Sequence, residues 1–114
     1  MDSVGFALEG FDAVGRWRTI DELGDPIDVS GTLPDGSAFS GVAEFRAALL
    51  SSETFRTVLA EKLMVYALGR GVEYYDMPAI RAIVRDADAN EQRFSRYVVG
   101  VVSSTPFQMR RAAP

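Results

Sequence analysis

The residues that most enzymes use for acid–base or metal chemistry are scarce in this 114-residue sequence. It contains no histidine and no cysteine. This removes the commonest general base, thiolate nucleophiles, disulfides, and the usual ligands of zinc or covalently attached haem. Carboxylates, tyrosines and methionine sulfur are the groups left for chemistry, and the sequence shows no recognisable catalytic arrangement of them. We therefore expect a protein that is not an enzyme.

Acidic residues crowd the first quarter of the chain. Two of them could form the acid and base of a catalytic pair. Because turns attract aspartate and solvated surfaces attract glutamate, a structural role is the better interpretation. The residues are Glu9, Asp12, Asp21, Glu22, Asp25 and Asp28.

A second acidic motif, Asp86–Asn90, begins like a calcium-binding loop, with oxygen side chains at alternate positions. Glu91 stands where such a loop needs glycine, and Tyr97 stands where it needs a bidentate glutamate. The motif therefore predicts a turn between helices, and we expect no metal site.

Aromatic residues and methionines are candidate contacts for a partner. Tyr74 and Tyr75 follow a predicted helix end, where aromatic rings can line a binding site or simply cover the core. Met77 and Met109 lie in irregular surroundings, so each could bind a soft metal or haem iron, with packing as the ordinary alternative. The candidate partner contacts are Trp17, Arg70, Tyr74, Tyr75 and Phe107.

Composition indicates one small globular domain over residues 1–114, since 47% of residues are hydrophobic and 25% are charged. The net charge of −4 and the pI near 4.7 argue against nucleic acid as a partner. No signal peptide or membrane-spanning run is recognisable.

The strongest helix pattern follows Ser52, where Phe55, Leu59, Leu63 and Tyr66 recur at helical spacing. Glycines at 69 and 71 predict the end of this helix. The segment 76–78, Asp-Met-Pro, predicts the cap and first turn of the next one. We therefore expect a helical hairpin with a tyrosine pair at its corner.

The remaining patterns predict a mainly α, α+β fold of about four helices with a small two- or three-stranded antiparallel sheet near the N-terminal third. Further helices are expected from Gly41, over 80–87 and over 94–102, with Ser40 as the first cap. Strands are expected at 27–33 and 37–39 around a turn at 34–36. Segment 16–20 could add a third strand, with Trp17 in the core.

An ordered set of short motifs runs over nearly the whole chain: DSVGFALE (2–9), FD (11–12), GRWR (15–18), GTLPDG (31–36), YALGR (66–70), YYD (74–76) and PFQMR (106–110). Together these motifs resemble one family, the C-terminal domain of unknown function of large exported bacterial cytochrome c-like proteins. In that family, a haem-attachment motif typically lies just upstream. Ser3 departs from the proline usual in the family.

The resemblance implies that the chain is the C-terminal module of a longer cytochrome c-like protein, or the partner of a separate haem-bearing chain. It implies haem c in that neighbour, none in this chain, and a periplasmic or extracellular location. We expect a non-catalytic accessory module that packs against the cytochrome, with Met109 as a candidate axial haem ligand and Met1 and Met77 as weaker ones. The alternatives are a haem-independent protein interaction module and a carboxylate-based enzyme.

Overall fold

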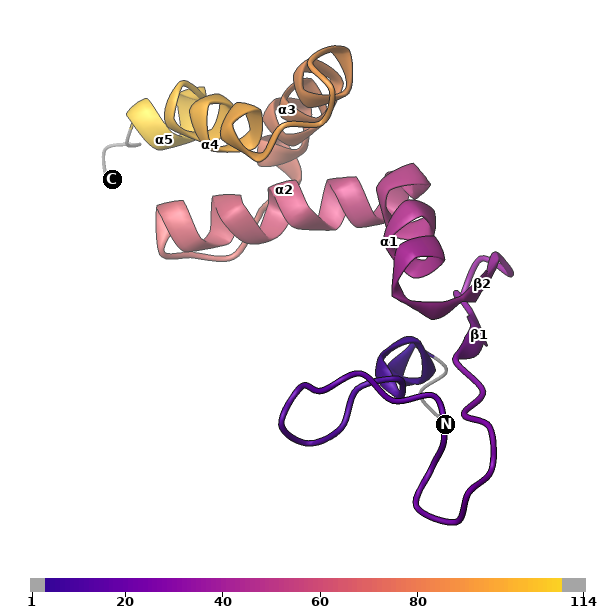
Figure 1. Cartoon of the computed structure of the whole chain (residues 1–114). Coiled ribbons are helices and arrows are strands. Elements are labelled where there is room, and N and C mark those ends of the chain that lie inside the picture. Colours follow the sequence, from indigo (N-terminus) through magenta and orange to yellow (C-terminus); the bar gives the residue numbers. More distant parts are fainter. Residues whose placement is uncertain (1–3, 110–114) are drawn as a thin grey trace. The chain divides into compact units, whose positions relative to one another are not determined.

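The computed structural model describes residues 4–109, which form two compact units (Figure 1). Unit 1 is Met1–Ser52 and unit 2 is Glu53–Pro114. The expectation of one domain over residues 1–114 stays a prediction. Met1, Ser3 and the final arginine of the PFQMR motif, Arg110, lie outside the described residues.

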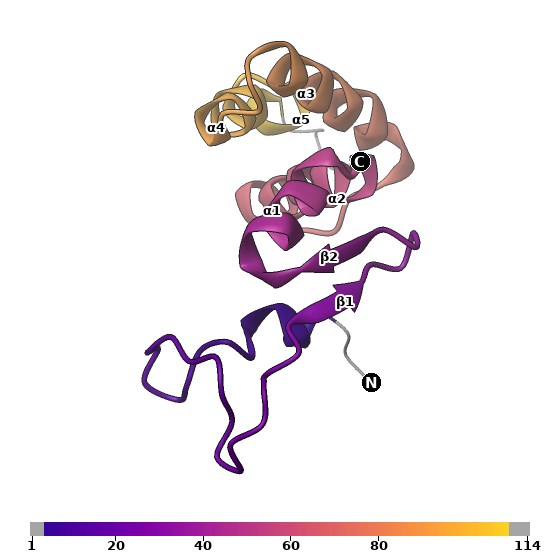
Figure 2. The same ribbon diagram turned by 45° about the vertical axis from the view of Figure 1, so that its right-hand side comes forward.

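Unit 1 combines a short 3-10 helix, a β-hairpin and one α-helix. The elements are η1 (Gly5–Leu8), β1 (Ser30–Thr32), β2 (Ala38–Ser40) and α1 (Gly41–Ser51). Strand β2 packs beside α1, and η1 contacts both α1 and β1 (Figure 2). Among the described residues of this unit, three hydrophobic side chains are buried, and they form its small core: Ala7, Leu33 and Phe39.

The two-stranded antiparallel sheet is confirmed, with Ser30 opposite Ser40. Its turn forms where the sequence predicts it. Gly36 has a φ of +87°, a value that glycine adopts without strain, and its N–H donates to the carbonyl of Leu33 at 2.9 Å. The carboxylate of Asp35 accepts the N–H of Ser37 at 2.8 Å and fixes the exit from the turn.

The predicted third strand does not form. Phe11 and Trp17 make one isolated antiparallel bridge, and Ile20 and Pro26 make another. The expectation that Trp17 belongs to the core is wrong, because its side chain is 56% exposed. Its ring lies against the backbone of Gly10, where an added Cβ would come within 2.7 Å of the indole. Trp17 therefore covers backbone and leaves one face in solvent.

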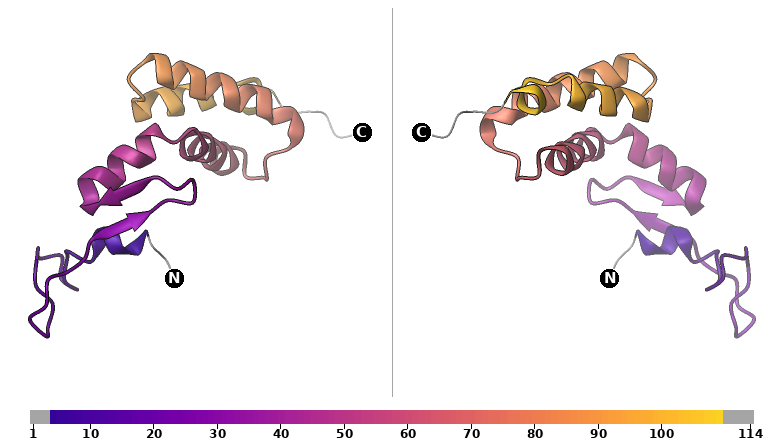
Figure 3. Two further views of the ribbon diagram at one scale, coloured as in Figure 1. Left: turned by 90° about the vertical axis from the view of Figure 1, so that its right-hand side faces the viewer. Right: turned by 90° about the vertical axis from the view of Figure 1, so that its left-hand side faces the viewer.

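Unit 2 is entirely helical among its described residues. It contains α2 (Glu53–Leu68), η2 (Tyr74–Asp76), α3 (Met77–Ala89), α4 (Phe94–Val102) and α5 (Thr105–Gln108). Helices α3 and α4 lie side by side and both pack on α2 (Figure 3). The mainly α fold with four longer helices is thus confirmed.

The core of unit 2 lies where these three helices meet. The helix expected over 80–87 forms as part of α3, and all of its apolar residues at helical spacing are buried: Ile80, Ile83, Val84 and Ala87. On α2 the predicted stripe is partly wrong, because Tyr66 is 88% exposed and Phe55 is also exposed. The buried positions of α2 are Ala60 and Met64, one helical turn apart, and small Ala60 allows close helix packing. The full core is Ala60, Met64, Ile80, Ile83, Val84, Ala87, Tyr97 and Val101.

Helix α5 is the element that the sequence patterns did not predict. Its signal is local, because Ser104 precedes the helix and Pro106 stands in its first turn, where no amide donor is needed. Among residues 4–109, no helix is long and apolar enough to cross a membrane.

Candidate functional site

The predicted tyrosine corner connects α2 to α3. Gly69 ends α2 with a φ of +65°, and its N–H donates to the carbonyl of Val65 at 3.0 Å. The chain then turns through η2, whose last residue is Asp76. Because Pro78 follows in the first turn of α3, the new helix starts immediately after the corner. The corner thus has a backbone fixed at both ends.

A buried ion pair holds the corner closed. Asp76 is fully buried, whereas the side chain of Arg70 is 39% exposed. Two hydrogen bonds join them: Nη1 of Arg70 donates to Oδ2 of Asp76 at 2.7 Å, and Nη2 donates to Oδ1 at 3.1 Å. The N–H of Glu73 also donates to Oδ2, at 2.9 Å, and Nη1 also donates to the carbonyl of Gly71 at 2.8 Å.

This arrangement differs from the predicted one, in which Asp76 caps α3. Its side chain makes no cap hydrogen bond to α3, because both carboxylate oxygens already accept donors from the preceding segment. The guanidinium of Arg70, aided by the N–H of Glu73, lowers the pKa of Asp76 against the opposing effect of burial. The same hydrogen bond raises the pKa of Arg70. Both groups are therefore charged, and they form an ion pair.

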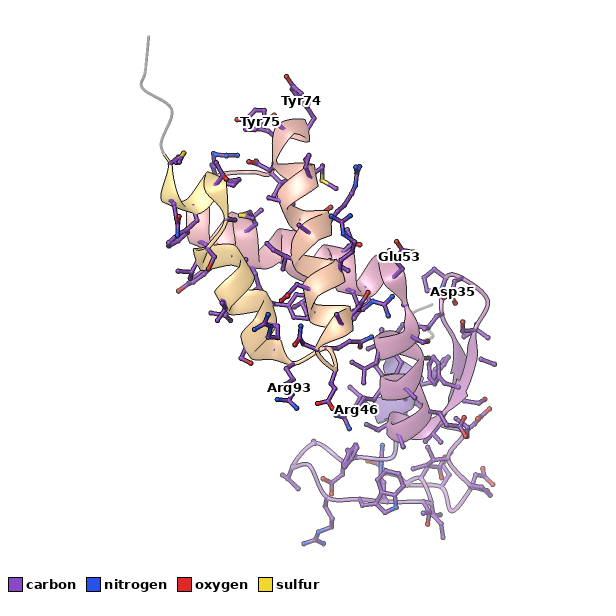
Figure 4. The ribbon with its side chains drawn as sticks, turned by 90° about the horizontal axis from the view of Figure 1, so that it is seen from above. Asp35, Arg46, Glu53, Tyr74, Tyr75 and Arg93 are labelled. Carbon is purple, nitrogen blue, oxygen red and sulfur yellow. The ribbon has the colours of Figure 1, made fainter. Side chains whose placement is uncertain are left out.

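The tyrosines stand on the solvent side of this pair. Their rings meet edge to face, with centroids 5.4 Å apart, and the guanidinium carbon of Arg70 lies 5.5 Å from the centroid of Tyr75. Tyr74 is 84% exposed. Figure 4 shows both rings at the start of α3, with Tyr74 directed away from the helix. Arg70 thus links the buried carboxylate to an exposed aromatic pair.

An open hollow of about 1280 Å³ lies beside this corner. The end of α2, the corner, the start of α3 and helix α5 all line it. Most of the lining residues are aromatic or aliphatic in type, and among the described residues Arg70 is the one exposed charged side chain that lines the hollow. The lining residues are Ala67, Leu68, Arg70, Tyr74, Tyr75, Asp76, Pro78, Ala79, Thr105, Pro106, Phe107 and Met109.

The hollow brings together five of the residues singled out from the sequence. Arg70, Tyr74 and Tyr75 come from the corner, and Phe107 and Met109 come from α5 and the residue after it. Trp17 belongs to unit 1, and Met77 packs on the core of unit 2. The central role of Asp76 was missed, although its position six residues after Arg70 in a short, glycine-containing connection was the available signal.

Several of the remaining acidic candidates bind structural partners. Asp12 and Asp21 each accept two backbone N–H groups within their own turns. In the rejected calcium motif, Asp86 forms two hydrogen bonds with Arg96 instead. No group of three or more potential metal-binding acids occurs in the described part of the chain.

The model of a family described as a protein of unknown function (DUF1585) matches residues 35–107, more than half of the chain. The matched span includes the whole corner and Phe107, whereas Trp17 and Met109 lie outside it. No curated protein and no solved structure matches the chain significantly.

Proposed function

The chain belongs to the DUF1585 family, and we propose that it is a non-catalytic accessory module that packs against a c-type cytochrome segment or chain. The hollow at the corner of unit 2 is the contact surface in this proposal. Its lining of aromatic side chains from η2 and α5, with aliphatic ones from α2 and α3, beside the Arg70–Asp76 ion pair, is the observation that carries it. The module acts outside the cytoplasm, in the periplasm or beyond, because the resembling cytochrome c-like proteins are exported.

The balance of polar and apolar groups supports docking over reaction. Asp76 is buried and bonded on both oxygens, so it has no position from which to exchange a proton with a substrate. Tyr74, Tyr75 and Phe107 are exposed large side chains of the kinds enriched at protein interfaces. Each could bury considerable area against a partner while the tyrosine hydroxyls stay hydrated at the edge.

The partner's haem edge fits the hollow in chemical terms. Met109, 71% exposed on its rim, offers a thioether of the kind that ligates haem iron in cytochromes. The side chain of Arg70 is 39% exposed, and its guanidinium could donate to a propionate. Haem, when bound by the partner, supplies one-electron transfer; this chain would cover the haem edge, exclude water and so help set its potential.

Affinity measurements with matched variants test the docking surface. The probe is a c-type cytochrome from the same organism, prepared with and without haem and titrated against the full chain by calorimetry. Tyr74→Ala and Phe107→Ala should each weaken binding about tenfold, as truncation of a central interface aromatic commonly does. Tyr66→Ala is the control, because Tyr66 is equally exposed but does not line the hollow.

The outcomes separate the proposal from its alternatives. If Tyr74→Ala and Tyr66→Ala lost the same amount of binding affinity, the hollow would not be part of the interface. Unchanged affinity for the haem-free cytochrome would favour a haem-independent interaction module. Turnover of any substrate by the purified chain would contradict the non-catalytic assignment.

Met109 has a separate test. In the complex with the haem-loaded cytochrome, Met109→Leu should alter the absorption spectrum and lower the reduction potential, since thioether ligation raises it. Leucine retains the apolar volume and removes only the sulfur. An unchanged spectrum rejects ligation while leaving the docking proposal intact.

A further inference from the structure

Unit 1 contains two consecutive hairpin loops built to the same plan, an internal repeat that the sequence patterns did not reveal. The loops are residues 12–16, Asp-Ala-Val-Gly-Arg, and 21–25, Asp-Glu-Leu-Gly-Asp. In each loop, the first and last residues pair through the backbone: the N–H of Asp12 donates to the carbonyl of Arg16, and that of Asp21 to the carbonyl of Asp25, both at 2.9 Å.

The side chain of the first aspartate also makes equivalent hydrogen bonds in the two loops. Oδ1 of Asp12 accepts the N–H groups of Val14 at 3.0 Å and Arg16 at 2.8 Å. In the second loop, Oδ1 of Asp21 accepts the N–H groups of Leu23 at 2.8 Å and Asp25 at 2.9 Å. The fourth residue of each loop is a glycine with positive φ, +79° at 15 and +91° at 24. Each loop is thus held by its own backbone and its own carboxylate.

These rigid loops present aliphatic side chains to solvent. Val14 is 85% exposed and Leu23 is 88% exposed, and they occupy the same position in the two loops. Trp17 and Ile20, at the bases of the hairpins, are also more than half exposed. Figure 3 shows both loops at the end of unit 1 that lies away from the β1–β2 turn. We call Val14, Trp17, Ile20 and Leu23 the twin-loop surface.

Ordering a loop around an exposed aliphatic tip is unfavourable unless something else stabilises the loop or covers the tip. Here the aspartates stabilise the loops, so the tips are displayed in a defined conformation before any partner arrives. Pre-organised apolar contacts reduce the entropic cost of binding. The twin-loop surface therefore has the properties of a docking site.

The charges around the surface indicate the kind of partner. Residues 4–29 carry six acidic side chains and only two basic ones, Arg16 and Arg18. Nε of Arg18 donates to the carbonyl of Glu9 at 3.4 Å. The backbone N–H of Asp25 lowers the pKa of Asp21, and Ser30 lowers the pKa of Asp28, so these carboxylates stay charged at neutral pH. An anionic membrane would be repelled, whereas a basic protein surface would be attracted.

We infer that the twin-loop surface docks a protein partner whose face combines lysine or arginine side chains with apolar sockets for Val14 and Leu23. This inference is independent of the cytochrome proposal, because it uses a different unit and requires no haem. Trp17, the only tryptophan, gives the surface its own fluorescent reporter.

The test uses the full chain and defined probes. The first is an amphipathic helical peptide of leucine and lysine, the second an oligolysine of equal charge, and the third a leucine and glutamate peptide. Binding is followed through Trp17 emission, which should shift to the blue when the indole is covered. The leucine and lysine peptide should bind at least about tenfold more tightly than oligolysine, because only it can bury the aliphatic tips.

Val14→Ser with Leu23→Ser should abolish that preference while leaving the oligolysine affinity unchanged. The control is Val99→Ser with Val102→Ser, two exposed valines of α4 in unit 2, which should bind both peptides as the wild type does. Near-ultraviolet circular dichroism of Trp17 verifies that the loop variant keeps its fold. The inference is overturned by equal affinity for the two cationic peptides, by binding of the glutamate peptide, or by an emission shift that only phosphatidylcholine–phosphatidylglycerol vesicles produce.

Discussion

The corner of unit 2 and the twin-loop surface of unit 1 both expose apolar side chains, but different interactions hold them in place. At the corner, a fully buried carboxylate binds a half-exposed arginine, and a core of eight buried residues lies nearby. In the twin loops, half-buried aspartates bind the backbone, and the described part of the unit has three buried hydrophobic residues. An exposed apolar side chain can thus be held in place by a buried ion pair and core beneath it, or by hydrogen bonds within its own loop.

The difference has consequences for stability. Interactions made through a buried core extend over several helices, so their loss should affect the whole of unit 2. Hydrogen bonds within a five-residue loop extend no further than that loop, so their loss should change only local opening. Substitutions in the two regions should therefore differ in both size and reach.

The largest effect is expected for Phe39→Ala. Phe39 is one of the three buried hydrophobic residues of unit 1, and its ring centroid lies 5.0 Å from that of Phe45. Truncation should lower the free energy of unfolding of this unit by about 3–5 kcal/mol, through lost burial and an internal cavity. Urea denaturation followed by Trp17 fluorescence measures the change. Leu23→Ala, at an exposed loop tip, should shift the midpoint very little.

Asp76→Ala should have the next largest effect. Removing a buried carboxylate leaves Arg70 and the N–H of Glu73 without their acceptor, which should cost about 3 kcal/mol. Thermal unfolding followed by far-ultraviolet circular dichroism measures it. Asp86→Ala is the matched control, since its pair with Arg96 is 43% exposed on the aspartate side and should contribute at most about 1 kcal/mol. Equal destabilisation by both variants would contradict the role given to burial.

The stability of unit 2 should also fall in acid because of Asp76. Its pKa is lowered in the folded protein by Arg70, so protonation is harder in the folded than in the unfolded state. The resulting stabilisation is fully present above the unfolded pKa of about 3.8 and is lost as the pH falls toward the lower folded value. Denaturation midpoints of the wild type should therefore decrease through this range. The decrease should be smaller in Asp76→Asn, and an identical acid dependence would exclude Asp76 as its source.

The smallest effect is expected in the twin loops. Asp21→Ala should speed amide hydrogen exchange at Leu23 and Asp25 several-fold, because both amides lose their side-chain acceptor, and should leave unit 2 unchanged. Exchange followed by nuclear magnetic resonance gives residue-level rates. Glu22→Ala is the control in the same loop. If Asp21→Ala left these exchange rates unchanged, the carboxylate would not be what rigidifies the loop.

Periodic patterns predicted the parts of the fold that depend on burial of a repeated face. The buried face of α3 was found for this reason. The turn at Gly36 was instead predicted from its local Pro-Asp-Gly sequence. The buried face of α2 was predicted wrongly because side-chain size determines which face packs. Ala60 is small enough to let neighbouring helices approach, whereas Tyr66 leaves its large ring in solvent. Aromatic character alone does not determine which side of a helix is buried.

The candidate site was predictable as a set of exposed residue types, but its assembly was not. Phe107 and Met109 are far from Tyr74 in sequence, and only the packing of α5 against α2 and α4 brings them to one hollow. The Arg70–Asp76 pair depends on the path of a short connection that contains no periodic signal. The twin loops were missed because their likeness lies in hydrogen-bond geometry and in only two identical residue types.

The most direct test of the proposed docking function is a nuclear magnetic resonance titration of the isotopically labelled full chain with the haem-loaded c-type cytochrome. The largest shift changes should occur at Arg70, Tyr74, Tyr75 and Phe107, with little change at Tyr66. Shift changes confined to residues outside the hollow would contradict the account. The absence of any shift change when the cytochrome is in large excess would also contradict it.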